Sequence, residues 1–521
     1  MVMRKRWARI WRVAGVCVLL GAALHAWREP AAPSPPAAGP ARSTTDPVPA
    51  APAHWRLGRV DLHACTLPAP AGGGSPAAWC GQWPVAENPA HPEARTIRLR
   101  LAVIRSDAQT PAADMVTVLA GGPGQAATEA WSQLAAGLRG LTAHRNVLLL
   151  DQRGTGGSNP LTCHDDQSRS DSITQDDAAL IRAEASQCAE RLSRKADLRM
   201  YTTTLAIGDL EQVRQALGAP RLDLIGISYG TRVAQQYAGS YPAAVRSIVL
   251  DSVVPNALAL GQDHAANLDA ALQAQARRCE SEPGCRRRFG DPYAELRQLQ
   301  RQLQAHPQTL NLHDPQRYTV GQASLSADTL AIVARMFAYS PLTMAVLPLS
   351  VDAAIHGNAE PLTAQARLLQ GRLSDSMSSG MGYAVSCSED ADLLHTRSAD
   401  QHTLLGNRFV STLQAICSVW PKGDRPPGFH RDFRSAAPVL LLSGEFDPVT
   451  PPRYARQVAS GLPHARLLVL KGQAHNVILA GCTPRLVAHF IAQADVAAFD
   501  DSCLQGMQAP PFFTDFNGAA P

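Results

Sequence analysis

The sequence predicts an α/β fold with a doubly wound, mostly parallel sheet that is interrupted by a long helical insertion. Up to about residue 254, short apolar runs typical of buried strands alternate with amphipathic helical stretches. Residues 255–436 are rich in helical patterns and lack obvious core strands, and the alternation resumes at residue 437. A chain of 521 residues with 45% hydrophobic residues is long and apolar enough to bury a large core.

The first 26 residues have the pattern of a signal peptide. Basic residues among the first twelve positions precede an apolar stretch, residues 13–26, that is short for a membrane span. Residues 27–55 are rich in Pro and Ala and predict an extended linker. We therefore expect a periplasmic or secreted protein with no stable membrane span in the mature chain. The alternative is an uncleaved N-terminal anchor, which also keeps the body of the protein outside the cytoplasm.

The cysteines predict a disulfide-bonded protein. Setting Cys17 aside from the eleven cysteines leaves ten, and none of them forms a C-x-x-C pair that would favour a zinc site. An even number at loose spacing indicates five disulfides and an oxidising compartment. We favour pairing of neighbours along the chain, which closes only short loops, although spacing alone does not fix the connectivity. The candidates are Cys65, Cys80, Cys163, Cys188, Cys279, Cys285, Cys387, Cys417, Cys482 and Cys503.

Residues 56–254 are expected to form the first part of the α/β core. Residues 96–104 alternate in polarity, as a strand near a sheet edge does. The more continuously apolar runs predict central parallel strands at residues 115–120, at 146–151, from 222 and at 245–251. Helical periodicity covers residues 204–217, where Gly218 predicts the C-terminal cap, and residues 231–238.

The remaining chain divides into the helical insertion and a second part of the core. Residues 437–521 return to the α/β pattern, with strands expected at residues 438–444 and 465–470 and a helix near residues 484–494. Because residues 255–436 interrupt one α/β domain, we expect them to form a lid over the site.

The motif Gly-x-Ser-x-Gly at residues 226–230 lies between a strand pattern and a helix pattern. Strand, tight turn and helix are the context in which this motif forms a nucleophile elbow, so Ser228 is the candidate nucleophile. The alternative is a serine in a glycine-rich turn, because the bare motif is often found by chance.

A glycine-rich loop, Gly-Gly-Pro-Gly at residues 121–124, separates two of the predicted central strands. Backbone amides in such a loop can point at one spot without interference from side chains. We expect the amide of Gly122, together with that of Tyr229, to form an oxyanion hole. The alternative is a plain Gly-Pro turn.

A serine nucleophile needs a base and a group that orients the base. Asp447 follows the strand predicted at residues 438–444, and His475 follows the strand predicted at residues 465–470. Both therefore lie at the carboxyl edge of the sheet, where open α/β sheets carry their sites. Taken singly, Asp447 could cap a turn and His475 could be a surface histidine. The order Ser, Asp, His, with each residue just after a strand, favours the catalytic interpretation.

The motifs together resemble the peptidase family of proline iminopeptidase and the secreted bacterial tripeptidyl aminopeptidases, which have the α/β-hydrolase fold. The similarity spans about residues 80–503 and lies in residues 121–124, 151–158, 226–231, 249–251, 445–451 and the His475 loop. It implies a triad of Ser228, Asp447 and His475 and an exopeptidase that acts on free N-termini. The chain departs from many relatives at Ala120, where they have His, and at residues 473–476, which replace Gly-His-Gly.

An exopeptidase must recognise a protonated α-amine, and a desolvated ammonium needs a carboxylate partner. Similar secreted peptidases carry an acidic residue two positions after a cysteine that corresponds to Cys387. The resemblance therefore indicates Glu389 as the amine-binding residue, with Asp390 as the second choice. The alternative is that Ser388 caps a helix and that the acidic residues favour its N-terminus.

We predict an exported serine aminopeptidase that acts on a peptide or a small amide or ester. An esterase or lipase with the same triad is the alternative, and a non-catalytic α/β-hydrolase used as a binding module is a third interpretation. We expect no metal and no cofactor. The net charge of +4 and the lack of a basic patch with interleaved aromatic residues argue against a nucleic acid partner.

Overall fold

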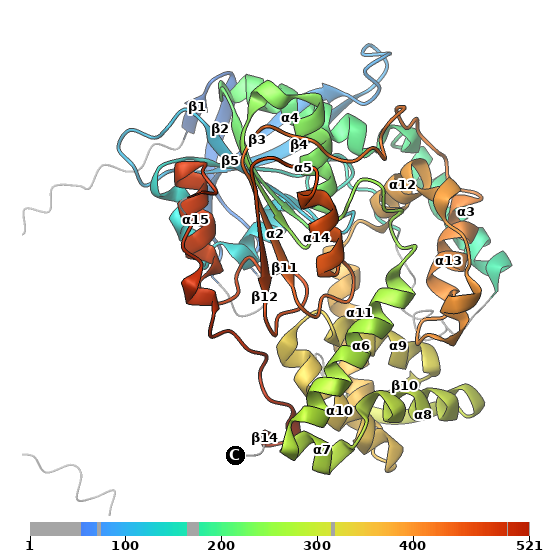
Figure 1. Cartoon of the computed structure of the whole chain (residues 1–521). Coiled ribbons are helices and arrows are strands. Elements are labelled where there is room, and N and C mark those ends of the chain that lie inside the picture. Colours follow the sequence, from blue (N-terminus) through green and yellow to red (C-terminus); the bar gives the residue numbers. More distant parts are fainter. Residues whose placement is uncertain (1–53, 70–73, 164–176, 314–317, 498, 520–521) are drawn as a thin grey trace, which may run out of the picture. The chain divides into compact units, whose positions relative to one another are not determined.

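Ten strands of the chain form one large sheet, and helices cover both of its faces (Figure 1). The computed structural model describes residues 54–69, 74–163, 177–313, 318–497 and 499–519. The predicted signal peptide, residues 1–26, lies outside the described residues. Of the predicted linker, residues 27–55, only the last two residues are described, and they begin the first strand.

The strand order of this sheet is β1-β2-β3-β4-β6-β5-β7-β8-β11-β12. The six strands from β6 to β12 run parallel to one another, whereas β1 to β4 are antiparallel to their neighbours. This mixed, mostly parallel sheet confirms the predicted fold class. The strands are β1 (His54–Leu57), β2 (Val60–Thr66), β3 (Ala77–Ala86), β4 (Thr96–Ile104), β5 (Met115–Leu119), β6 (Val147–Leu150), β7 (Leu222–Ile227), β8 (Val245–Asp251), β11 (Val439–Gly444) and β12 (Ala465–Leu470).

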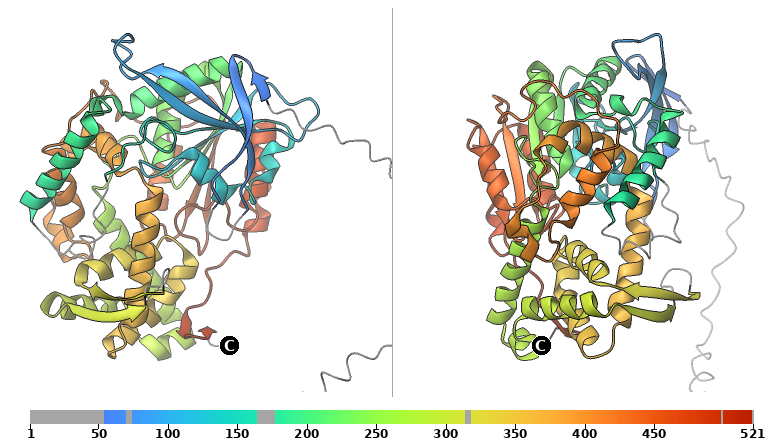
Figure 2. Two further views of the ribbon diagram at one scale, coloured as in Figure 1. Left: turned by 180° about the vertical axis from the view of Figure 1, so that it is seen from behind. Right: turned by 90° about the vertical axis from the view of Figure 1, so that its right-hand side faces the viewer.

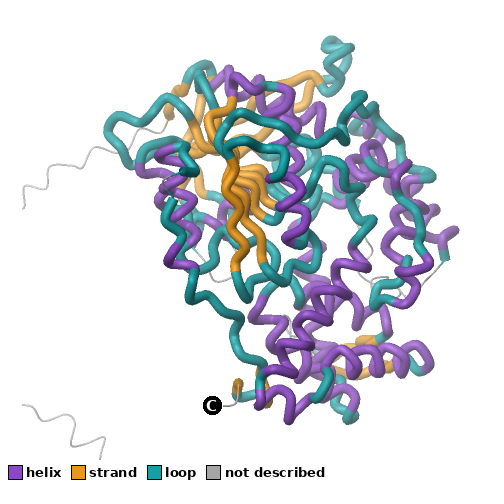
Figure 3. Tube along the Cα trace, viewed as in Figure 1, coloured by secondary structure: helices purple, strands orange, loops and turns teal. Residues whose placement is uncertain are grey.

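Residues of the parallel strands point alternately into two separate hydrophobic clusters. In β6, Leu148 and Leu150 belong to the first cluster, and Val147 and Leu149 belong to the second. Both faces of the strands are therefore buried, which explains their continuously apolar sequences. Figure 3 shows the strands lying between layers of helices. The first cluster includes residues of α4 (Thr203–Leu217), α5 (Tyr229–Ser240) and α14 (Pro452–Ala459), and the second includes residues of α2 (Ala127–Leu134) and α15 (Thr483–Gln493).

The segment between β8 and β11 builds a third hydrophobic cluster from its own helices. Leu272, Leu299, Val333, Leu347 and Leu362 are all buried in this cluster. Figure 1 shows these helices gathered below the sheet. They are α6 (His264–Ser281), α8 (Pro292–Ala305), α9 (Ala327–Phe337), α10 (Pro341–Ile355) and α11 (Glu360–Ser376), with α7 (Pro283–Phe289) and the hairpin of β9 (Gln308–His313) and β10 (Val320–Leu325) beside them.

The last two helices of this segment pack elsewhere. The helices α12 (Ser379–Glu389) and α13 (Arg408–Cys417) contribute Val385 and Ile416 to the first hydrophobic cluster, which also contains residues of α3 (Ala178–Ser193). Figure 2 shows α3 lying beside α12 and α13 in both views. The helical segment therefore has two parts, and the second part shares its core with the sheet.

The predicted central strands agree with the structure to within one or two residues at each end, and one other expectation is wrong. Residues 96–104 form β4, but this strand is the fourth in the sheet and does not lie near an edge. The reason is that β1, β2 and β3, which the sequence analysis did not identify, extend the sheet beyond it. The helical segment lacks strands of the large sheet, as expected, and its hairpin β9–β10 forms a separate two-stranded sheet.

The ten predicted cysteines form five disulfides. Each joins neighbours along the chain, as favoured from the sequence: Cys65–Cys80, Cys163–Cys188, Cys279–Cys285, Cys387–Cys417 and Cys482–Cys503. Among the residues described, no helix is both long enough and apolar enough to span a membrane.

Candidate active site

Ser228 lies on a tight turn between β7 and α5. Its backbone adopts φ 55° and ψ −122°, a conformation that residues other than glycine rarely adopt. The Ser228 amide donates to the carbonyl of Asp251 at 2.9 Å and so holds this turn. Gly230 permits the close approach, because a Cβ there would collide with the carbonyl oxygen of Leu119. The turn leaves Ser228 partly exposed at the carboxyl edge of the sheet.

His475 connects Ser228 to Asp447 through its two ring nitrogens. Nε2 lies 3.1 Å from Ser228 Oγ, and Nδ1 lies 2.8 Å from Oδ2 and 3.0 Å from Oδ1 of Asp447. Asp447 follows β11 and His475 follows β12, which are neighbouring parallel strands. The carboxyl ends of parallel strands share one edge, so residues far apart in the sequence meet there.

The surroundings of Asp447 favour its ionised form. The buried Asp447 carboxylate accepts from the amides of Val449 and Thr450 at 2.9 and 2.8 Å and from the Thr450 hydroxyl at 2.9 Å. Burial alone would raise the pKa of Asp447, but His475 and these donors outweigh burial and lower it. An ionised carboxylate only accepts hydrogen bonds, so His475 carries its proton on Nδ1 and accepts from Ser228 on Nε2. The sequence analysis missed the contribution of Thr450.

Asp251, the last residue of β8, holds the loop of His475, and the sequence analysis did not identify this role either. Its carboxylate accepts from the amides of Val477 and Ile478 at 3.0 and 2.9 Å. Burial raises the pKa of Asp251 to about 6, while the two amides oppose this increase. The signal was present in the sequence, because Asp251 directly follows an apolar strand, in the same way that Asp447 comes soon after one.

The two predicted oxyanion donors belong to segments that adjoin Ser228. A Cβ on Gly121, the residue before Gly122, would lie 3.2 Å from the Cβ of Ser228, so the glycine-rich loop contacts the nucleophile turn. Gly122 itself has φ 109°, a conformation that favours glycine. The amide of Tyr229 is the first of α5, and the first amides of a helix have no carbonyl partner within that helix. It is therefore not committed to a carbonyl of α5.

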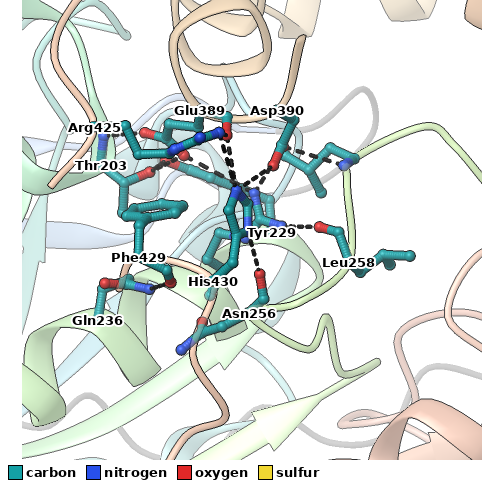
Figure 4. Close-up of polar contacts among 12 residues, drawn as sticks. Thr203, Tyr229, Gln236, Asn256, Leu258, Glu389, Asp390, Arg425, Phe429 and His430 are labelled. Atoms are coloured by element: carbon teal, nitrogen blue, oxygen red, sulfur yellow. Dashed lines mark hydrogen bonds and ion pairs between the residues drawn. The ribbon is translucent and has the colours of Figure 1, made fainter. Parts of the chain in front are cut away.

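Glu389 and Asp390, the residues expected to bind a substrate amine, lie in the interior, and Glu389 contacts Thr203 (Figure 4). They are 1% and 0% exposed. Asp390 accepts from Arg232 at 2.8 Å and from the amide of Leu260 at 3.1 Å. Glu389 accepts from the amide and the hydroxyl of Thr203 at 2.6 and 3.0 Å. Both carboxyl groups are thus engaged by the protein itself.

Thr203 links Glu389 to the residue that follows the nucleophile. The Thr203 hydroxyl lies 2.6 Å from the hydroxyl of Tyr229, which also accepts from Gln152 at 3.2 Å. Burial raises the pKa of Glu389 to about 7, opposed by Arg232 and by the bonds from Thr203. The sequence analysis did not identify Thr203 or Gln152, since nothing in the local sequence shows that they meet Tyr229.

The helical segment contacts the loops of both Asp447 and His475. The carbonyl of Tyr339, two residues after α9, accepts from the amide of His475 at 3.1 Å, and the two rings pack edge to face with centroids 4.9 Å apart. Asn267 of α6 donates to the carbonyl of Val449 at 2.7 Å, two residues after Asp447. Movement of these helices would therefore disturb the trio.

The site combines a candidate nucleophile, a base oriented by a carboxylate, and two backbone amides. This is the set of groups needed for acyl transfer through a serine ester. Within the described parts of the chain, no group of three or more His, Cys, Asp or Glu side chains is arranged to hold a metal ion.

The family model described as alpha/beta hydrolase fold matches residues 115–481, which is more than half of the chain. The chain belongs to the α/β-hydrolase fold family. The match begins at the first residue of β5 and includes Ser228, Asp447 and His475. The protein is accordingly a serine hydrolase of this fold.

Its similarity to known α/β-hydrolases is distant. The serine protease Hip1 of Mycobacterium tuberculosis (strain ATCC 25618 / H37Rv) is 25% identical over 416 residues, covering 73% of this chain and 78% of Hip1. YuaR of Escherichia coli (strain K12), named as a hydrolase, is 25% identical over 401 residues, covering 74% of this chain and 78% of YuaR. The tripeptidyl aminopeptidase of Streptomyces lividans is 36% identical over 115 residues, 20% of this chain and 21% of that protein. Among solved structures, the proline iminopeptidase of Mycobacterium smegmatis has a TM-score of 0.38 at 18% identity, covering 80% of this chain and 99% of that one.

Proposed function

We propose that this α/β-hydrolase is an exported serine aminopeptidase that uses Ser228, His475 and Asp447. The observation that carries the proposal is the continuous chain of hydrogen bonds from Ser228 Oγ through both ring nitrogens of His475 to the ionised Asp447. A hydroxyl bonded to a base that is itself oriented by a carboxylate is an activated nucleophile.

The reaction follows from these positions. Ser228 Oγ attacks the substrate carbonyl while Nε2 of His475 takes its proton, and Asp447 stabilises the resulting imidazolium. The amides of Gly122 and Tyr229 donate to the oxygen on which negative charge develops. His475 then protonates the leaving amine, and water hydrolyses the acyl-enzyme by the same route.

The preference for free N-termini is assigned to Glu389, with Asp390 as the second choice. An α-ammonium next to the bond to be cleaved needs a carboxylate in a desolvated site. Glu389 is one residue, Thr203, away from the Tyr229 hydroxyl, and the Cys387–Cys417 disulfide constrains the end of its helix. Because Thr203 donates two hydrogen bonds to the Glu389 carboxylate in this structure, a substrate amine must either replace Thr203 as a donor or bond to the carboxylate alongside it.

Export is supported by the disulfides. Five disulfides in one chain are typical of proteins that fold in an oxidising compartment, the periplasm or the outside of the cell. Residues 1–26 are proposed to direct this export as a signal peptide, with residues 27–55 as the linker. Residues 56–254 and 437–521 are proposed as the two parts of the core, and residues 255–436 as a lid.

An esterase with the same triad is the second candidate. The observation that favours it is the burial of Glu389 and Asp390, since a carboxylate that stays bonded to Thr203 or Arg232 would leave no anchor for an amine. Such a site would still cleave small acyl esters.

The test combines an active-site probe with paired substrates. The wild-type protein is expected to react with a fluorophosphonate at Ser228 and to cleave amino-acyl amides with a free α-amine faster than the same amides with a blocked amine. Ser228→Ala should abolish labelling and lower turnover by about a million-fold, because it removes the nucleophile. Labelling with turnover of acyl esters alone would support the esterase, and failure of both labelling and turnover would leave only a binding module.

A further inference from the structure

Arg335, in the last turn of α9, has no acidic partner in the described part of the chain, and Tyr339 links it to the candidate base. Its Nη2 donates to Nδ1 of His264 at 3.2 Å and to the hydroxyl of Tyr339 at 3.4 Å. Its guanidinium also lies over the ring of Phe409, with Cζ 5.0 Å from the centroid. All of these neighbours are uncharged or aromatic. Among the residues that the structure describes, no carboxylate lies within ion-pair distance of Arg335.

Other arginines of the helical segment do pair with carboxylates. Arg288 pairs with Asp352, and Arg397 pairs with both Asp263 and Asp400. An arginine stays charged at any physiological pH and presents a planar fork that matches a carboxylate. An unpaired guanidinium that is only partly exposed therefore has unused capacity to bind an anion.

Arg335 is linked to the candidate base through Tyr339. Its partner Tyr339 packs its ring against His475 and accepts the His475 amide. His475 must reach the leaving nitrogen to protonate it, so a leaving group comes next to His475 during the reaction. Ser228 bonds His475 directly, whereas Arg335 is linked to His475 through Tyr339, and both Ser228 and Arg335 are partly exposed.

His264 adds a second donor at the same place. Burial, the charge of Arg335 and His475 hold the pKa of His264 well below its usual range, so its imidazole is neutral. Because Nδ1 accepts from Arg335, the single ring proton lies on Nε2. His264 and Phe409, whose ring centroids are 4.6 Å apart, also fix the plane of the guanidinium.

We propose that Arg335 binds a carboxylate on the leaving group of the substrate. This carboxylate is the α-carboxylate of a short peptide that leaves as a single amino acid, or an acidic side chain directly after the cleaved bond. The inference rests on the proposed function and narrows it from peptides in general to short or acidic ones.

The test compares acids and amides within one enzyme. The first series consists of alanine peptides of two to five residues, each supplied as the free acid and as the C-terminal amide. The second series consists of the same C-terminal amides with either Asp or Asn as the last residue. The wild type should cleave one carboxylate-bearing series with a kcat/KM about 10- to 100-fold higher than its uncharged partner, the range of one charged hydrogen bond. A preference for the free acid identifies the α-carboxylate as the source, and a preference for Asp over Asn identifies the side chain.

The quantity compared is the ratio of kcat/KM for the carboxylate-bearing substrate to kcat/KM for its uncharged partner. Arg335→Gln should bring this ratio close to one. Arg335→Lys, which keeps the charge but loses the planar fork of the guanidinium, should give a ratio between one and the wild-type value. Because the ratio is taken within each variant, a general loss of activity cancels. Arg301→Gln, at an exposed arginine of α8, should keep the wild-type ratio. A wild-type ratio near one, or a ratio that persists in Arg335→Gln, overturns the inference.

Failure of the proposed function gives a different result, since no peptide of either kind would be cleaved. In that case an acyl ester of glycolate is compared with the ester of glycolamide, which measures the same ratio on an alcohol leaving group. A preference for the glycolate ester that Arg335→Gln removes supports the inference without a peptidase, and equal rates overturn it.

Discussion

At the scale of single residues, the surroundings of two buried carboxyl groups, Asp447 and Glu389, shift their pKa values in opposite directions. Asp447 receives hydrogen bonds from two amides, a hydroxyl and His475, and together these lower its pKa despite burial. The Glu389 carboxylate accepts from the amide and the hydroxyl of Thr203, with Arg232 at 3.9 Å, and burial raises its pKa to about 7. The environments therefore suit Asp447 to a permanent charge and Glu389 to a charge that depends on its contacts.

Glu389→Gln tests whether Glu389 binds the substrate amine or only positions Thr203 and Tyr229. If Glu389 anchors the substrate amine, this variant should lower kcat/KM for free-amine peptides by about one to three orders of magnitude, as expected for loss of a charged hydrogen bond. A small acyl ester has no amine, so its hydrolysis should change little. Steady-state kinetics with both substrates measure this difference.

The matched control is Glu211→Gln. Glu211 of α4 is also a buried glutamate, and its carboxylate accepts from Tyr237 of α5 at 2.7 Å, but it has no link to Thr203 or Tyr229 among the contacts described. This control should leave the ratio of the two activities unchanged. Equal losses on both substrates in Glu389→Gln would contradict amine binding and indicate that Glu389 positions Thr203 and Tyr229.

At the scale of elements, β8 supports the loop of the candidate base through Asp251. Asp251→Asn leaves one side-chain oxygen to face two amides that both donate, so one of the bonds to Val477 and Ile478 is lost. At pH 8 Asp251, with its pKa raised to about 6, is ionised in the wild type. We expect kcat to fall about tenfold or more at this pH, in line with the loss of a charged hydrogen bond next to His475.

Asp223→Asn is the control at the opposite edge of the sheet. Asp223 is buried near the start of β7 and pairs with Arg246 at 2.8 Å. Both variants should lower the midpoint of urea unfolding, and only Asp251→Asn should lower kcat. Equal kcat values for the two variants would contradict a role of Asp251 in positioning His475.

The parallel strands could be predicted from the sequence because both of their faces are buried. Runs such as residues 146–151 are apolar throughout, so they stand out without knowledge of their neighbours. The antiparallel strands gave weaker signals. β1 has exposed and half-buried residues in alternation, and β3 contains Gly81 and Pro84. β3 joins the sheet by pairing with β4 and β1 joins it by pairing with β2, and the local pattern does not reveal either pairing.

The candidate site also has a part that the sequence predicts and a part that it does not. Ser228, Asp447 and His475 each follow a recognisable strand, so their order and position were enough to select them. The surroundings of Glu389 were not predictable, because Thr203 lies 186 residues earlier in the chain and the contact depends on how α12 packs on α4. The surroundings of His475 were not predictable for the same reason, because only the folded helical segment brings Tyr339, and Arg335 bonded to it, to His475.

At the scale of the whole molecule, the disulfides divide between regions near the candidate site and regions remote from it. Cys387–Cys417 joins α12 to α13 two residues before Glu389. Cys65–Cys80 joins the neighbouring strands β2 and β3 at the antiparallel end of the sheet. These two crosslinks act on the same chain, so they allow stability and activity to be separated.

Removal of each disulfide should lower stability by a similar amount. The chain-entropy estimate is about 3 to 4 kcal/mol for the 30-residue separation of Cys387 and Cys417 and about 3 kcal/mol for the 15-residue separation of Cys65 and Cys80. The double variant Cys387→Ala/Cys417→Ala should also lower kcat/KM, because the end of α12 that carries Glu389 loses its covalent link to α13. Cys65→Ala/Cys80→Ala should keep kcat/KM within about twofold of the wild type. Denaturant unfolding and kinetics on one free-amine peptide measure both effects, and a kcat/KM that falls equally in both double variants would contradict a specific coupling of the Cys387–Cys417 disulfide to the site.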